Sequence, residues 1–210
     1  MRRILSKIQD VSTSSGLLPA TLFLALFFIL GAVVGCISAL HVDGDGLQDL
    51  VTFVRGFLSL AKSGLSGRSW VDIVVSVLKY PLLAVLFGLT ALGVVLEPAL
   101  LMARGFFLTF AVTSFVRLFG PKGILLALAV YLFQCVIVLP ATFLLGAQGF
   151  LSAGTFLSLS MKRGGGTPER VFPPLYFGRV LLSAGALALC VLLEAFLTPP
   201  LVSYIVQFVW

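Results

Sequence analysis

Five long apolar runs, separated by polar turns, dominate the pattern of side chains along the chain. They cover residues 17–40, 73–96, 98–117, 123–144 and 179–197. Each run is close to the length of about 20 residues that an α-helix needs to cross a bilayer core of about 30 Å. The pattern therefore predicts an all-α fold, a polytopic transmembrane helical bundle of five spans, with residues 1–210 in a single integral membrane domain.

Prolines within these runs predict where the helices are interrupted. Pro98 and Pro140 each lack the backbone N–H that a regular helix would use. We place the turn between the second and third spans near Glu97-Pro98, and the end of the last span at Pro199-Pro200. The stretch 81–160 is compatible either with full crossings or with re-entrant segments.

Residues 47–62 show a different periodicity, which is typical of an amphipathic helix. Their apolar positions recur every three or four residues and so share one face. The opposite face carries polar side chains such as Asp49, Thr52 and Ser59. The pattern predicts a helix on the outer side of the membrane. This helix could bind a partner or the membrane surface, and the alternative is that it packs as a lid on its own bundle. The candidate partner-binding residues are Leu47, Leu50, Val51, Val54, Phe57 and Leu58.

Composition excludes an ordinary soluble domain, because 60% of the residues are hydrophobic and only 10% are charged. The net charge of +6 does not indicate nucleic-acid binding, since the basic residues are scattered singly or in pairs and form no stripe. They indicate membrane topology instead, with the amino end inside the cell and the carboxyl end outside. The basic residues assigned to the inner side are Arg2, Arg3, Lys7, Arg104, Lys162, Arg163, Arg170 and Arg179.

Reactive side chains form no pattern that is typical of an enzyme or a metal site. His41 is the single histidine, and Cys36, Cys135 and Cys190 all fall inside apolar runs. A zinc site or a hydrolytic triad needs several such groups at suitable spacing, whereas a thiol in apolar surroundings behaves as a small hydrophobe. We therefore expect a protein that is not an enzyme and has no catalytic residue, no metal and no cofactor.

Polar residues inside the apolar runs are the remaining candidates, because charged groups at membrane depth are costly and often functional. The sequence places Glu97 and Arg104 near an inner turn and Glu194 near the outer end of the last span. Gln134 should lie deepest, where its amide needs an interhelical hydrogen bond. We assign a structural or path-lining role in the membrane to Glu97, Arg104, Gln134, Pro140 and Glu194.

The chain resembles the stage II sporulation protein M family, integral membrane proteins of endospore-forming bacteria, over most of its length. The stretch Leu30-Gly31-Ala32-Val33-Val34-Gly35 is similar to that family's glycine-paired first helix, in which a GxxxG spacing permits close approach of another helix. Arg104-Gly105-Phe106-Phe107 falls where the family shows Lys-Gly followed by apolar residues. Gly120-Pro121-Lys122-Gly123 precedes a run similar to the family's next helix.

The fourth apolar run carries the best match. Gln134 followed by Leu139-Pro140-Ala141 is similar to the Pro-Gln-Asn and later Ile-Pro-Ala of the sporulation branch. Phe133 and Cys135 replace the flanking Pro and Asn, and Val138 stands where the wider group has an acid. The resemblance therefore indicates the family and leaves the branch open.

The resemblance implies a non-enzymatic role in forespore engulfment. Family members resemble scaffolds at the sporulation septum that localise two cell-wall hydrolases, an amidase/endopeptidase and a lytic transglycosylase. On this hypothesis the chain contacts hydrolases and membrane lipid, does not contact nucleic acid, and is a candidate homo-oligomer in the cell membrane. The alternative is a small transporter or channel subunit, whose site would lie at the proline-broken helices around Glu97, Arg104 and Gln134.

Overall fold

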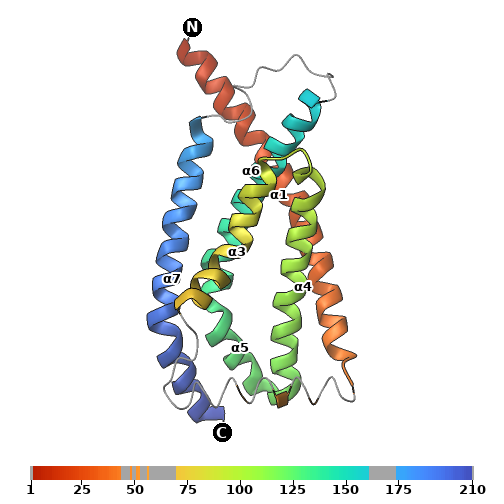
Figure 1. Ribbon diagram of the computed structural model, residues 1–210, viewed down its shortest axis with the longest axis vertical. Helices are drawn as coiled ribbons and strands as arrows, with labels where there is room; N and C mark the ends of the chain where they lie inside the picture. The colour runs from red at the N-terminus through yellow and green to blue at the C-terminus, as the bar shows by residue number, and fades with distance from the viewer. Residues whose placement is uncertain are drawn as a thin grey trace.

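The computed structural model describes residues 2–43, 48, 51, 52, 56, 70–160 and 174–209. Within that part of the chain, five helical segments are long and apolar enough to cross a membrane, which confirms the predicted polytopic helical bundle. These candidate spans are Gly16–Leu40, Val71–Gly88, Gly93–Phe119, Pro121–Leu157 and Gly178–Thr198. The helices (Figure 1) are α1 (Arg2–Leu40), α3 (Trp70–Gly88), α4 (Gly93–Phe119), α5 (Pro121–Phe133), the π-helix η1 (Gln134–Val138), α6 (Leu139–Ser160) and α7 (Pro174–Val209).

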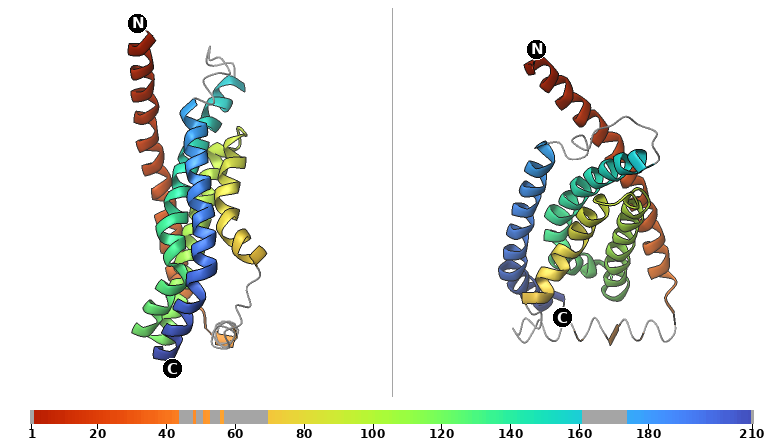
Figure 2. Two further views of the ribbon diagram at one scale, coloured as in Figure 1. Left: turned by 90° about the vertical axis from the view of Figure 1, so that its left-hand side faces the viewer. Right: turned by 45° about the horizontal axis from the view of Figure 1, so that its top comes forward.

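The helices stand side by side, with α1 at one edge and α7 at the other (Figure 1 and Figure 2). α1 packs mainly against α4 and also contacts α6, whereas α7 contacts α5, η1, α3 and α6. Only about a fifth to a third of each span is buried inside the bundle, and many large apolar side chains of the spans are exposed. That distribution is expected where lipid, rather than water, surrounds the helices.

Glycines bring α1 and α4 into backbone contact. A Cβ atom at Gly31 would collide with the carbonyl oxygen of Met102, and one at Gly35 would collide with that of Phe106. From the opposite helix, Gly105 approaches the carbonyl oxygen of Phe28 in the same way. This close approach confirms the prediction from the GxxxG spacing and identifies α4 as the partner helix. It also allows the Thr109 hydroxyl to donate a hydrogen bond across the interface, to the oxygen of Ala32 at 2.8 Å.

Arg117, near the carboxyl end of α4, holds the end of α1. Its guanidinium donates hydrogen bonds to the carbonyl oxygens of Ala39 and Val42, at 2.9 and 2.6 Å, and forms an ion pair with Asp43 at 2.8 Å. The last carbonyls of a helix have no partners within the helix, and the helix dipole favours a cation there. Arg117 therefore caps α1 and fixes the point at which the chain leaves it.

The prediction of a turn at Glu97-Pro98 was wrong. The chain turns at residues 89–92, where Leu89 and Thr90 donate backbone hydrogen bonds to oxygens three residues earlier. Glu97 and Pro98 lie inside α4, which begins at Gly93. Neighbouring helices satisfy the backbone well enough for a membrane helix to continue through a proline.

Two further helix ends differ from the sequence prediction. The fourth span does not end near residue 144, because α5, η1 and α6 follow one another and give one crossing from Pro121 to Leu157. The last candidate span, Gly178–Thr198, ends just before Pro199-Pro200 as predicted, but the helix α7 itself continues to Val209. The stretch 81–160 is helical throughout, apart from the turns at residues 89–92 and 120.

Candidate functional site

Polar side chains from α3, α4, η1 and α7 meet in the middle of the bundle. Arg104, near the middle of α4, is 5% exposed, and Glu194 on α7 is 2% exposed. Residues that are spaced far apart in sequence are brought together here because α3 packs against α4, η1 and α7, and η1 packs against α7. We refer to the following residues as the central polar cluster: Tyr80, Arg104, Gln134, Cys190 and Glu194.

Arg104 is held in this cluster by an aromatic ring and by an acidic side chain. Its Cζ atom lies 4.4 Å from the centroid of the Tyr80 ring, a cation–π distance. Glu194 attracts it electrostatically from α7. Gln134 donates a long hydrogen bond, at 3.4 Å, from Nε2 to Oε1 of Glu194. Polar contacts at membrane depth thus join α3 to α4 and η1 to α7.

A π-helical turn at η1 gives the cluster its shape. The backbone N–H of Leu139 bonds to the oxygen of Gln134, five residues earlier, and Pro140 follows with no N–H to donate. The Cys190 thiol makes a weak contact to the carbonyl oxygen of Phe133 at 3.7 Å. A π turn widens the helix by one residue, and such turns are frequent at functional sites. Here the wider turn presents Gln134 to α7.

Glu97 occupies a second polar position, closer to the turn at 89–92. Its side chain is fully buried, and neither carboxyl oxygen has a hydrogen-bond partner among the described residues. Oε2 faces Gly146, while Oε1 lies against Gly149, where a Cβ atom would collide with it. Gly149 in turn packs against Gly88 of α3. The glycines of α3 and α6 therefore provide the space that the Glu97 side chain fills.

The structure brings together three of the five residues that the sequence predicted for the membrane interior. Arg104, Gln134 and Glu194 share the central polar cluster. Glu97 is separate from it, and its neighbours are glycine and leucine. Pro140 lies at the start of α6, directly after η1, and its side chain is exposed.

Two members of the cluster were missed by sequence reasoning. The pattern of apolar runs did not single out Tyr80, and Cys190 was expected to behave as a small hydrophobe. The fold places the Tyr80 ring beside the Arg104 guanidinium, and Cys190 is fully buried. The order Lys79-Tyr80 within an apolar run was a usable signal, because an aromatic ring next to a cation at membrane depth often stabilises that cation.

The predicted partner-binding segment is described only in part. Val51 is helical and half-buried, and Thr52 is also helical. The other predicted contact residues, Leu47, Leu50, Val54, Phe57 and Leu58, lie outside the described residues.

The comparison with known families gives one match. The model of the family described as stage II sporulation protein M matches residues 24–199, which include every described span from α1 to α7 in whole or in large part. No curated protein and no solved structure matches the chain.

Proposed function

The chain belongs to the stage II sporulation protein M family. On that premise we propose that it is a non-enzymatic membrane scaffold. In this role it localises peptidoglycan hydrolases at the sporulation septum for engulfment of the forespore. The family match is the observation that carries this proposal. It identifies a multi-pass sporulation membrane protein, and the role of the predicted partners is our extension of it.

The architecture supports a recruiting role through the segment that follows α1. Arg117 fixes Ala39, Val42 and Asp43 to the end of α4. The amphipathic segment 47–62 begins a few residues later, so its starting point is tied to the bundle. A helix that lies across a membrane surface with one apolar face is a common mode of partner recognition. In the proposed mechanism the bundle anchors this segment on the outer side, where the cell wall lies.

The test is co-purification from sporulating native cells. A tagged wild-type chain is compared with Val54→Asp/Phe57→Asp, which places two charges on the predicted contact face. Thr52→Asp/Ser59→Asp is the matched control, because it adds the same charges to the opposite face of the same segment. We expect an amidase/endopeptidase and a lytic transglycosylase to be recovered with the wild type and the control, and lost from the contact-face variant.

Recovery of no hydrolase with the correctly folded wild-type chain would overturn the scaffold proposal. Equal recovery of the hydrolases with all three forms would show that the contact surface lies outside residues 47–62, and the scaffold role would still stand.

A transporter or channel subunit is the second candidate, favoured by the central polar cluster at membrane depth. It predicts solute flux in proteoliposomes that is lost on Arg104→Gln or Glu194→Gln. Flux with no recovered hydrolase would favour this candidate over the scaffold.

A further inference from the structure

Lys79 interrupts the lipid-facing surface of α3. Val71, Val75, Leu82 and Leu86 are exposed, at 66, 54, 66 and 56% respectively. They recur with Lys79 at intervals of three or four residues and so form one face of the helix. Lys79 is exposed on that face near the middle of a candidate span. A positive charge in this position is costly unless water or an anionic group reaches it.

A second cation lies directly behind this lysine. The Nζ atom of Lys79 is 4.9 Å from the centroid of the Tyr80 ring, and the Cζ atom of Arg104 is 4.4 Å from the same centroid. One ring therefore contacts both positive groups, one from α3 and one from α4. The Nε atom of Arg104 is buried and has no hydrogen-bond partner among the described residues.

The charges around this pair leave an excess of positive charge. Glu194 attracts Arg104 from α7, and among the described residues Lys79 forms no ion pair. Asp72 is exposed two helical turns away from Lys79, toward the start of α3. Glu97 lies against glycines of α6 and has no described contact with either cation. Two cations thus face one nearby carboxylate.

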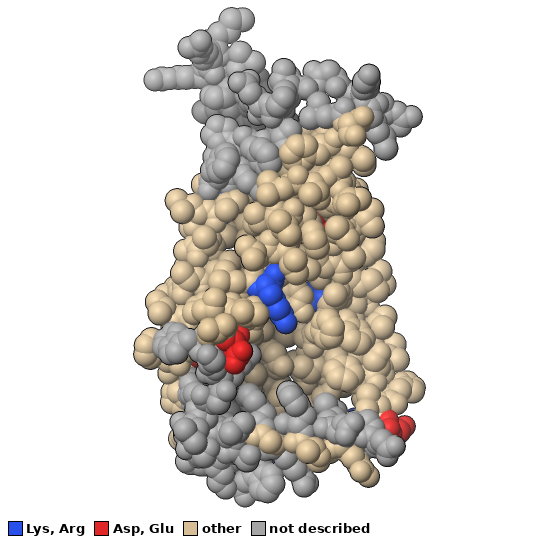
Figure 3. All heavy atoms as spheres, viewed as in Figure 1, with Lys and Arg blue, Asp and Glu red and all other residues tan. Residues whose placement is uncertain are grey.

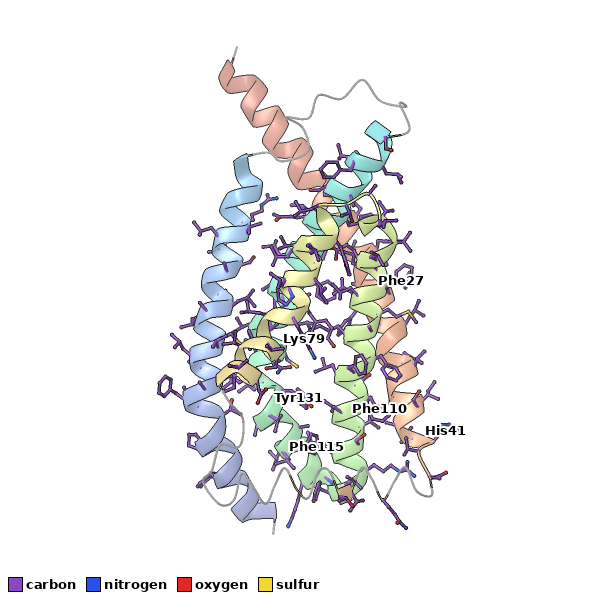
Figure 4. All side chains as sticks on the ribbon, in the orientation of Figure 1. Phe27, His41, Lys79, Phe110, Phe115 and Tyr131 are labelled. Carbon is purple, nitrogen blue, oxygen red and sulfur yellow. The ribbon has the colours of Figure 1, made fainter. Side chains whose placement is uncertain are left out.

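A hollow lies next to the two cations on one face of the bundle. Figure 3 shows basic side chains halfway up an otherwise largely uncharged face, with a hollow immediately below them. Figure 4 places Lys79 between α3 and α4, with Tyr131 of α5 and Phe110 of α4 nearer the lower end. In Figure 1, α3 begins at Trp70 well above the lower ends of α4 and α5.

We propose that Lys79, Tyr80 and Arg104 form a binding site for the phosphate of an anionic lipid headgroup, which enters the hollow between α3 and α4 from the surrounding membrane. Phosphate oxygens accept charge-assisted hydrogen bonds from the exposed Lys79 ammonium, and the buried Arg104 guanidinium on the Tyr80 ring adds positive charge next to that site. The acyl chains then lie along the exposed apolar stripe of α3, beside Val75 and Leu82.

The apolar stripe favours a lipid over a soluble anion. The lower end of the bundle is the predicted outer surface, and a headgroup reaches Lys79 from there without crossing the full bilayer. A lysine at this depth draws headgroups and water inward by local thinning of the membrane. The site is independent of the proposed scaffold function, since it lies in the bundle and not in the segment 47–62.

Native mass spectrometry of the full-length chain in detergent tests this site, with phosphatidylglycerol and phosphatidylcholine titrated separately. Lys79→Gln is the main variant, because an exposed side chain can be changed without disturbing the core. Lys122→Gln is the matched control, since it removes the same charge from an exposed position at the start of α5. Circular dichroism of each variant verifies the fold.

We expect the wild type and Lys122→Gln to bind phosphatidylglycerol with equal affinity, and Lys79→Gln to bind it about tenfold more weakly, since one charge-assisted contact is lost. Phosphatidylcholine should bind more weakly than phosphatidylglycerol to all three forms. Tyr80→Leu should also weaken phosphatidylglycerol binding, because it removes the ring that positions both cations.

Three results would overturn the proposal. One is unchanged phosphatidylglycerol affinity in folded Lys79→Gln. Another is an equal loss in Lys122→Gln, which would show attraction by total charge alone. The third is displacement of the lipid by an equal concentration of inorganic phosphate, which would show that the acyl chains contribute nothing.

Discussion

The contact between α3 and α6 at Gly149 allows a quantitative test of the packing around Glu97. A Cβ atom added at Gly149 would lie 3.0 Å from the carbonyl oxygen of Ala84 and 3.2 Å from the Cα of Gly88, and it would collide with Oε1 of Glu97. Two of these obstacles are backbone atoms, which cannot rotate away. The Gly149→Ala variant must therefore push α3 and α6 apart.

The size of the effect follows from two opposing terms. Alanine is favoured over glycine in a helix by about 1 kcal/mol, whereas overpacking of a tight interface costs about 1–3 kcal/mol. Gly154, on the same helix, has open space around its Cα. Gly154→Ala therefore gains the helix propensity of alanine without the cost of overpacking. We expect Gly149→Ala to be less stable than Gly154→Ala by about 1–3 kcal/mol, the overpacking term alone, because the propensity term is common to both.

The free energy of unfolding can be measured by titration of the detergent-solubilised chain with sodium dodecyl sulfate, followed by circular dichroism. Repeating the glycine substitution in a Glu97→Ala background removes the collision with Oε1, so the cost of Gly149→Ala should fall by about 0.5 kcal/mol or more. Equal stability of Gly149→Ala and Gly154→Ala would refute the close packing that we describe at Glu97.

Three further predictions concern polar contacts between helices. Arg104→Gln should destabilise the chain by about 1 kcal/mol because it removes the cation from the Tyr80 ring, and the same substitution should cost less in a Tyr80→Leu background in the same titration; simple additivity of the two single effects would contradict the contact. Arg117→Gln should cost less than about 1 kcal/mol overall, since the ion pair is partly exposed to solvent, but it should raise amide hydrogen exchange at residues 37–43 at the end of α1; unchanged exchange there would argue against the cap. Thr109→Val should cost about 0.6 kcal/mol through loss of the hydrogen bond to Ala32, and Thr21→Val, whose hydroxyl donates to the oxygen of Leu17 in the same helix, is the control that should cost less.

The number of spans and their approximate positions follow from the sequence because burial in lipid requires long apolar runs, and this requirement is local. The Gly31 and Gly35 spacing likewise indicated a close helix contact, since the missing Cβ atoms are a property of one segment. The identity of the partner helix was not available from that spacing. It depends on how α4 rotates to place Met102 and Phe106 against α1.

The turn between α3 and α4 shows why helix ends were harder to predict. Pro98 is a strong helix-breaking signal in water, but within the bundle α4 continues through it. The actual turn at residues 89–92 has no proline, and its backbone is satisfied by bonds to oxygens three residues earlier. Gly88 and Gly93 flank this turn, and they were the signal that the sequence did offer.

The central polar cluster was only partly predictable for a related reason. Arg104, Gln134 and Glu194 were recognisable as polar residues in apolar runs, because such residues are rare there. Their grouping depends on the π turn at η1 and on the approach of α7, which periodicity does not reveal. Tyr80 and Cys190 become polar partners only once the helices are packed.

The most direct test of the scaffold hypothesis is the position of the hydrolases in living cells. Fluorescently labelled amidase/endopeptidase and lytic transglycosylase would be imaged in sporulating cells of the native host, with the chain present and after its depletion. The proposal predicts both enzymes at the septum in the first case, and dispersal with stalled engulfment in the second. Retention of both enzymes at the septum after depletion would contradict it.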